Sequence, residues 1–69
     1  MGATYDQTAA IYARQRENKL RELLRRDYGA RKYRLAGNDV HIYGKMPNTN
    51  IVGWYVLGSR EYVERDYQL

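Results

Sequence analysis

The chain has 69 residues, enough for one small domain spanning residues 1–69 but not for a large core. It has no Cys, which excludes disulfide bridges and thiolate metal sites, and it has no apolar run long enough to span a membrane. The formal net charge is +4, and the aromatic residues are eight Tyr and one Trp, with no Phe. We therefore expect a small, ordered, cytoplasmic protein in which tyrosine rings supplement a short supply of aliphatic side chains.

The positive charge is concentrated in residues 14–34, whereas residues 35–69 are close to neutral. A basic segment of this kind favours an acidic partner, either a nucleic-acid backbone or a carboxylate-rich protein surface. The alternative is a solvated helix, because Glu17 and Arg21 have the i,i+4 spacing at which side chains pair on a helix surface.

A long helix is predicted over residues 5–28. Thr4 and Gln7 have the spacing of a capping box, and Gly29 is suited to end the helix. Apolar side chains recur at helical spacing and predict one core-facing stripe: Tyr5, Ala9, Tyr12, Ala13, Leu20, Leu23 and Leu24. The opposite side of this helix is a candidate partner-binding face, comprising Ile11, Arg14, Arg21 and Arg25.

A β-hairpin is predicted after the helix, because the apolar period changes from helical spacing to alternation at Arg31. Gly37-Asn38 is a two-residue turn of the type II′ kind. Closing the hairpin on this turn places Leu35 opposite Val40, so that the apolar residues of both strands share one face.

A third strand is predicted over residues 51–57, after a turn-forming segment at residues 44–50. Both faces of this strand are apolar, so the alternation does not determine which face points inward. We expect Trp54 to point inward, because burying the largest ring enlarges a small core, and Tyr55 to lie on the opposite face. The predicted core is Leu20, Leu23, Leu35, Val40, Ile42 and Val56.

A short helix or a fourth strand is expected over residues 59–67. The helix is favoured, with Ser59 as its N-cap, because Tyr62, Val63, Asp66 and Tyr67 recur at helical spacing. The predicted fold class is thus α+β, in the order α-β-β-β-α with a three-stranded antiparallel sheet. This order and length resemble the double-stranded-RNA-binding domain. That family opens its last helix with a basic cluster, whereas this chain has Ser59, Arg60, Glu61 and Tyr62 there, so neither function nor site residues are carried over.

The residues available for catalysis are few. His41 is the only histidine, and the carboxylates near the C-terminus alternate with Arg60 and Arg65 rather than forming a metal-ligand pattern. No glycine-rich phosphate loop is present in the sequence. We therefore expect a non-enzymatic protein without a metal or cofactor.

The solvent-facing side of the predicted sheet is the main candidate site. It collects basic and aromatic side chains that would contact phosphates and stack on bases: Lys32, Arg34, Tyr43, Lys45 and Tyr55. Nucleic-acid binding, mainly through backbone charge, is the first functional hypothesis. The alternative is a phage- or plasmid-type accessory protein that inhibits or regulates a host protein, and a homodimer covering the Tyr and Trp surface is a variant of it.

Overall fold

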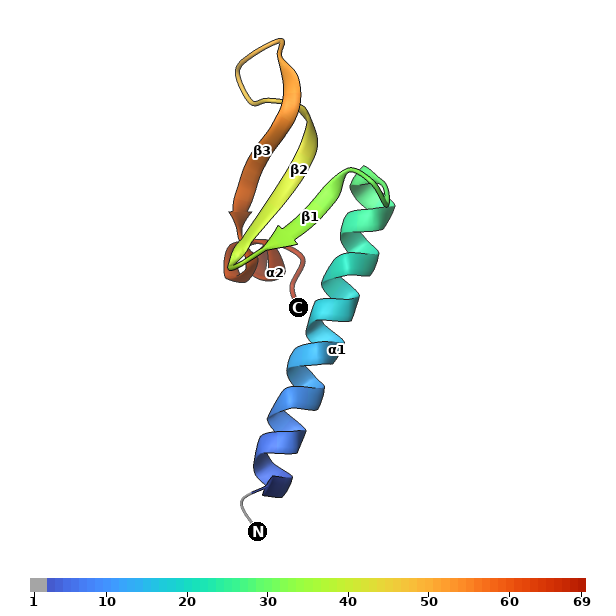
Figure 1. Cartoon of the computed structure of the whole chain (residues 1–69), viewed down its shortest axis with the longest axis vertical. Helices are drawn as coiled ribbons and strands as arrows, with labels where there is room; N and C mark the ends of the chain where they lie inside the picture. Colours follow the sequence, from blue (N-terminus) through green and yellow to red (C-terminus); the bar gives the residue numbers. More distant parts are fainter. Residues whose placement is uncertain (1–2) are drawn as a thin grey trace.

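The computed structural model describes the backbone of residues 3–69 and the side chains of residues 8–69. The elements are α1 (Ala3–Tyr28), β1 (Tyr33–Ala36), β2 (Asp39–Lys45), β3 (Val52–Ser59) and α2 (Arg60–Asp66). The strands form one antiparallel sheet in the order β1-β2-β3 (Figure 1). The predicted α+β class and α-β-β-β-α order are confirmed.

Helix α1 begins at Ala3, two residues before its predicted start, so Thr4 lies within the helix. The side chains of Thr4 and Gln7 lie outside the described residues, and the predicted capping box is therefore untested. The helix ends as expected at Gly29, which has a φ of +109° and donates its N–H to the Arg25 carbonyl at 3.0 Å. A positive φ at this position is readily adopted by glycine.

The β1–β2 hairpin has the predicted register. Leu35 pairs with Val40, and Tyr33 pairs with Ile42. At the turn, Gly37 has a φ of +59°, whereas Asn38 is not among the residues with positive φ. A positive φ at only the first central residue is the pattern of a type II′ turn, which matches the twist of the two strands.

Strand β3 pairs with β2 through a turn that Met46 closes by donating its N–H to the Ile51 carbonyl at 2.8 Å. The register then places Lys45 opposite Val52. It shifts at the other end of the strand, because Val40 pairs with Gly58 but His41 pairs with Val56, which leaves Leu57 as the extra residue of a β-bulge.

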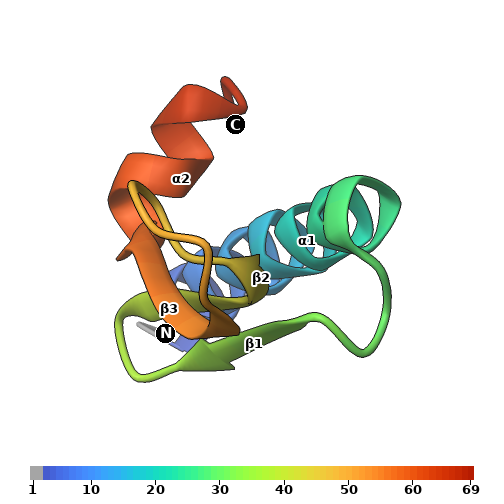
Figure 2. The ribbon, with the colours of Figure 1, turned by 90° about the horizontal axis from the view of Figure 1, so that it is seen from above.

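Helix α2 begins after Ser59, whose Oγ accepts a hydrogen bond from the Tyr62 N–H at 3.1 Å, as predicted for an N-cap. Both ends of α2 are tied to α1. Arg60, at its start, forms an ion pair with Glu17, and the hydroxyl of Tyr67, at its end, donates to Asp27 at 2.6 Å. Figure 2 shows that α1 and α2 lie on the same side of the sheet.

The core lies between the sheet and the two helices and comprises five buried side chains: Leu20, Leu24, Val40, Ile42 and Val63. Aliphatic and aromatic side chains that are partly buried pack around them: Tyr28, Tyr33, Leu35, Tyr55, Leu57 and Tyr67. The expectation that tyrosine rings supplement the core is thus confirmed for four of these residues.

Two predicted core residues are placed differently by the structure. Leu23 is half-buried and does not pack against the core cluster, whereas its neighbour Leu24 is fully buried. The prediction that Val56 belongs to the core is wrong, because its side chain is 54% exposed. The reason is that β3 has the opposite facing from the one predicted, with Tyr55 and Leu57 packed inward.

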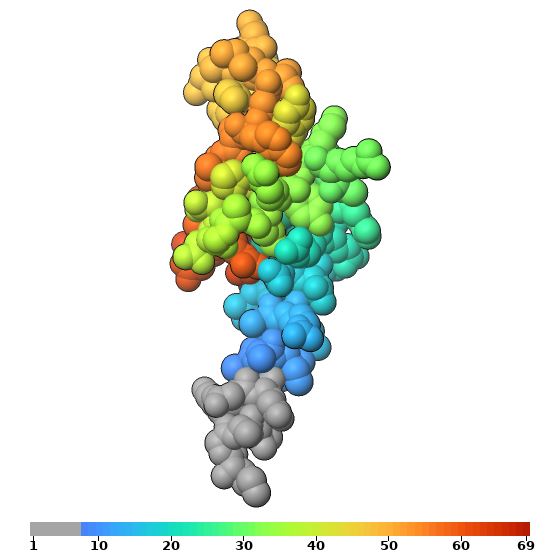
Figure 3. Space-filling view, in the orientation of Figure 1, coloured from blue at the N-terminus to red at the C-terminus, as the bar shows by residue number. Residues whose placement is uncertain are grey.

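The N-terminal part of α1 extends beyond the sheet (Figures 1 and 3). Residues 8–16, called the α1 arm below, are all exposed, including the stripe residues Ala9, Tyr12 and Ala13 that were predicted to face the core. A helix of 26 residues is ~39 Å long, whereas strands of 7 and 8 residues reach only ~27 Å. The sheet therefore covers only the C-terminal part of α1.

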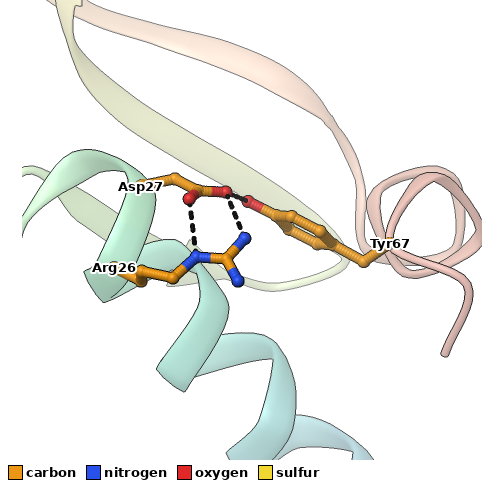
Figure 4. A network of polar contacts seen from close by, with 3 residues as sticks. All are labelled: Arg26, Asp27 and Tyr67. Carbon is orange, nitrogen blue, oxygen red and sulfur yellow. Dashed lines mark hydrogen bonds and ion pairs between the residues drawn. The ribbon is translucent and has the colours of Figure 1, made fainter.

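The C-terminal end of α1 carries a small polar network (Figure 4). Asp27 accepts hydrogen bonds from Arg26 Nε at 2.8 Å, Arg26 Nη2 at 3.2 Å and Tyr67 Oη at 2.6 Å. These hydrogen bonds hold the pKa of the Asp27 carboxyl below its ordinary value, and those from Arg26 have a larger effect than the one from Tyr67. Partial burial is the largest cause that raises the pKa of the Tyr67 phenol, and the hydrogen bond to Asp27 is the second largest.

The first prediction concerns the core. Leu24→Ala should lower the free energy of unfolding by ~2–5 kcal/mol, because it removes a fully buried side chain from a small cluster. Val56→Ala should cost much less, because that side chain is more than half exposed. Urea denaturation followed by circular dichroism measures both. Similar losses in the two variants would contradict the facing of β3.

The second prediction concerns Asp27. A carboxyl whose folded pKa is depressed stabilises the fold above its unfolded pKa, and this contribution is lost as pH falls through the folded pKa. Tyr67→Phe removes one of the three hydrogen bonds that Asp27 accepts, so the pKa of Asp27 should rise toward its ordinary value. Carboxyl titration by NMR measures this shift. Tyr62→Phe is the matched control, and an equal effect of both variants would show that the Tyr67 contact is absent in solution.

Candidate functional site

The sheet has one face turned away from both helices, called the outer face below (Figure 2). Its position follows from the pairing, because directly opposed residues of antiparallel strands point to the same side. Around its middle, this face presents the following side chains, including that of Lys32 just before β1: Lys32, Arg34, His41, Tyr43, Lys45, Val52, Trp54 and Val56.

These side chains form rows across the three strands. Arg34 lies opposite His41, which in turn lies opposite Val56. In the next row, the Tyr43 N–H donates to the Lys32 carbonyl at 2.9 Å. Tyr43 lies opposite Trp54 on its other side. Lys32, Arg34 and Tyr43 therefore share the solvent-facing side of the sheet, as predicted.

Trp54 is the centre of the outer face. The guanidinium carbon of Arg34 lies 4.5 Å from the centroid of the Trp54 ring, in a cation–π contact. The Tyr43 ring meets Trp54 edge to face, with centroids 5.5 Å apart and an interplanar angle of 66°. Trp54 remains 38% exposed and Tyr43 40% exposed. Rings of two strands and a cation of the third thus form one open cluster.

The cations of this face have no carboxylate partner. Among the ion pairs of residues 8–69, none includes Lys32, Arg34 or Lys45. The only carboxylate that β1, β2 or β3 carries on this side is Asp39, which lies at the far end of the central strand β2, opposite Ser59. The positive charge beside Trp54 is therefore not neutralised by a neighbouring side chain.

The second predicted surface is the helix face of Ile11, Arg14, Arg21 and Arg25. All four side chains are exposed, and they are spread along α1 rather than gathered at one point. Arg21 also forms an ion pair with Glu17 at 3.7 Å. Among the ion pairs of residues 8–69, this face therefore includes one cation with a carboxylate partner, whereas the outer face includes none.

One predicted site residue is wrong and one was missed. Tyr55 lies on the inner face of β3 and packs against the core, so it cannot join Tyr43. Trp54, which was expected inside, takes its place. The apolar alternation of β3 gave no signal for this facing. It follows from the turn, because a register that pairs Lys45 with Val52 also pairs Tyr43 with Trp54 and puts both rings on one face.

One depression in the surface is lined by side chains of both charges. The depression between the α1 arm and α2 has a volume of about 420 Å³ and is lined by Ala10, Ala13, Arg14, Arg16, Glu17, Arg60 and Glu64. Within the part of the chain whose side chains are described, no three His, Asp or Glu residues gather as metal ligands would. His41 is half-buried between Arg34 and Val56.

Comparison with protein-family models, with curated proteins and with solved structures found no match. No described helix combines the length and apolar character needed to cross a bilayer. The function is therefore inferred from the geometry of the outer face.

The third prediction tests the arrangement around Trp54. A double-mutant cycle with Arg34→Met and Trp54→Val should give a coupling of ~0.5–1 kcal/mol, as expected for an exposed cation–π contact. The control cycle pairs Trp54→Val with Arg31→Met and should give a coupling near zero. Free energies of unfolding from urea denaturation supply both values. Equal coupling in the two cycles would rule out a specific contact with Arg34.

Proposed function

We propose that this protein is a non-enzymatic, intracellular binder of single-stranded nucleic acid and that the outer face is its binding surface. The observation that carries the proposal is the cluster of Trp54, Tyr43 and Arg34, half-open to solvent and without a carboxylate partner. Lys32 and Lys45 extend the positive charge on either side of this cluster.

The chemistry of the cluster suits a single strand. Unstacked bases place their flat faces on aromatic rings or on guanidinium planes, while phosphates bind to basic side chains. Tyr43 and Trp54 offer the rings, and Arg34 offers a guanidinium that is already held against one of them. A base-paired duplex hides the faces of its bases, so it would engage only the positive charge.

The structure also favours a second candidate function. Ile11 and Tyr12 are each more than half exposed on the α1 arm, next to the basic residue Arg14. An exposed helix with aromatic, aliphatic and arginine side chains is suited to an acidic protein surface. In this case the protein would be an accessory protein of phage or plasmid type that inhibits or regulates a host protein, which is the alternative hypothesis from the sequence.

The fourth prediction separates these functions by salt dependence. Replacing both Lys32 and Arg34 with Glu should abolish binding of a single-stranded oligonucleotide at moderate salt. For single substitutions to neutral residues, each lost phosphate contact should reduce the slope of log affinity against log salt by ~0.7. Tyr43→Ala should weaken binding by ~1–3 kcal/mol and leave this slope almost unchanged, because it removes a stacking ring and no charge.

The matched control reverses the same number of charges on the helix face, with Arg14→Glu and Arg21→Glu. This variant should retain most of the oligonucleotide affinity if the outer face is the site. Fluorescence anisotropy with labelled oligonucleotides measures all variants. A wild-type protein that binds no oligonucleotide even at low salt would refute nucleic-acid binding and leave the protein-regulator function.

A further inference from the structure

The sheet has two edges that differ in character. The β1 edge is a strand of 4 residues that carries Arg34, with Lys32 just before it. The β3 edge is a strand of 8 residues, VGWYVLGS, which contains neither charge nor proline. Short strands and charged side chains discourage pairing of an edge with another chain, so only the β3 edge lacks these protections.

The backbone of β3 presents unpaired groups at regular positions. Since the Met46 N–H donates to the Ile51 carbonyl, the alternation of an antiparallel ladder turns Gly53 and Tyr55 toward β2 as well. The intervening residues, Val52, Trp54 and Val56, turn their N–H and C=O groups to the free edge. Among the backbone hydrogen bonds outside the helices and sheet, none includes these three residues.

The side chains of these three residues are self-complementary. The three residues give the order Val, Trp, Val in either direction of the strand. A second β3 can therefore be placed antiparallel to the first and centred on Trp54. In this register Val52 lies opposite Val56 of the second copy, and Trp54 lies opposite its own copy. Val52 is 60% exposed and Val56 54% exposed, and both would be covered by this pairing. No charge repulsion arises within the strand.

We infer that the β3 edge pairs with the β3 edge of a second copy of this chain, antiparallel and centred on Trp54. The result is a symmetric dimer with one continuous six-stranded sheet. The six strands are the three of each copy. Both outer faces then lie on the same side, which places two copies of the Arg34, Tyr43 and Trp54 cluster on one surface. Helices α1 and α2 both lie on the opposite side of the sheet from the outer face (Figure 2).

Cysteine cross-linking tests the register directly, because the chain contains no native Cys. Opposed residues that exchange hydrogen bonds across an antiparallel pair have Cα atoms ~5.5 Å apart, within the range that a disulfide spans. An oxidised mixture of Val52→Cys and Val56→Cys proteins should form the mixed cross-linked dimer. Each variant alone should not, because its two cysteines lie four residues out of register.

Ile11→Cys is the control for contact at the α1 arm, and it should remain largely uncross-linked. A dimer that forms with Ile11→Cys but not with the β3 mixture would place the interface on α1 and overturn the inference. Equal cross-linking of all variants would indicate random collision and would overturn it too.

A proline substitution tests the same edge in the otherwise native chain. Val52→Pro removes an N–H that faces the free edge and leaves the bonds to β2 intact, as proline allows at sheet edges. Self-association, measured by sedimentation, should weaken by ~10-fold or more, whereas Val52→Thr should retain it. The wild-type dimer should have twice the 8.2 kDa mass of the chain. A monomer mass at all concentrations would refute the dimer.

This inference is independent of the proposed function. Lys32→Glu with Arg34→Glu should abolish oligonucleotide binding without changing the mass of the dimer. A monomeric wild-type protein that still bound oligonucleotides would refute the dimer and leave the proposed function in place.

Discussion

Five buried side chains pack together and hold the two helices against the sheet, and the small size of this core limits how much of the sheet can be covered. Leu20 and Leu24 from α1, Val40 and Ile42 from β2, and Val63 from α2 are the only fully packed residues among those whose side chains the structure describes. Such a cluster can hold two helices against one side of a three-stranded sheet, but it cannot cover both sides. The exposed outer face is therefore a consequence of the small core, whereas the α1 arm is exposed because the sheet is shorter than the helix.

The outer face uses one arginine for two purposes. Arg34 stabilises the position of Trp54 through its cation–π contact, and it is also one of the cations that would meet a phosphate or a base. Preorganisation of this kind reduces the entropy that is lost when a flexible ligand binds. Pairing of two β3 edges would bring two copies of the cluster together on one surface, because it opposes Trp54 to its own copy.

The sequence was sufficient for the elements and for the hairpin, because the Gly37-Asn38 turn and the alternation of Tyr33 and Leu35 require the same register. It was insufficient for the facing of β3. Both faces of that strand are apolar, so the alternation does not say which set of residues points toward the core. Turn geometry decided the facing by pairing Tyr43 with Trp54. The exposure of the α1 arm was also missed, because helical periodicity indicates which side is apolar but not whether the sheet is long enough to cover it.

Nucleic-acid binding at the outer face can be tested by backbone NMR of the labelled protein during titration with a single-stranded oligonucleotide. We expect the largest amide shifts in β1, β2 and β3 around Arg34, Tyr43 and Trp54, and we expect the Trp54 indole signal to move with them. Shifts confined to the α1 arm, or an absence of shifts at low salt, would contradict the assignment of the outer face as a nucleic-acid-binding surface.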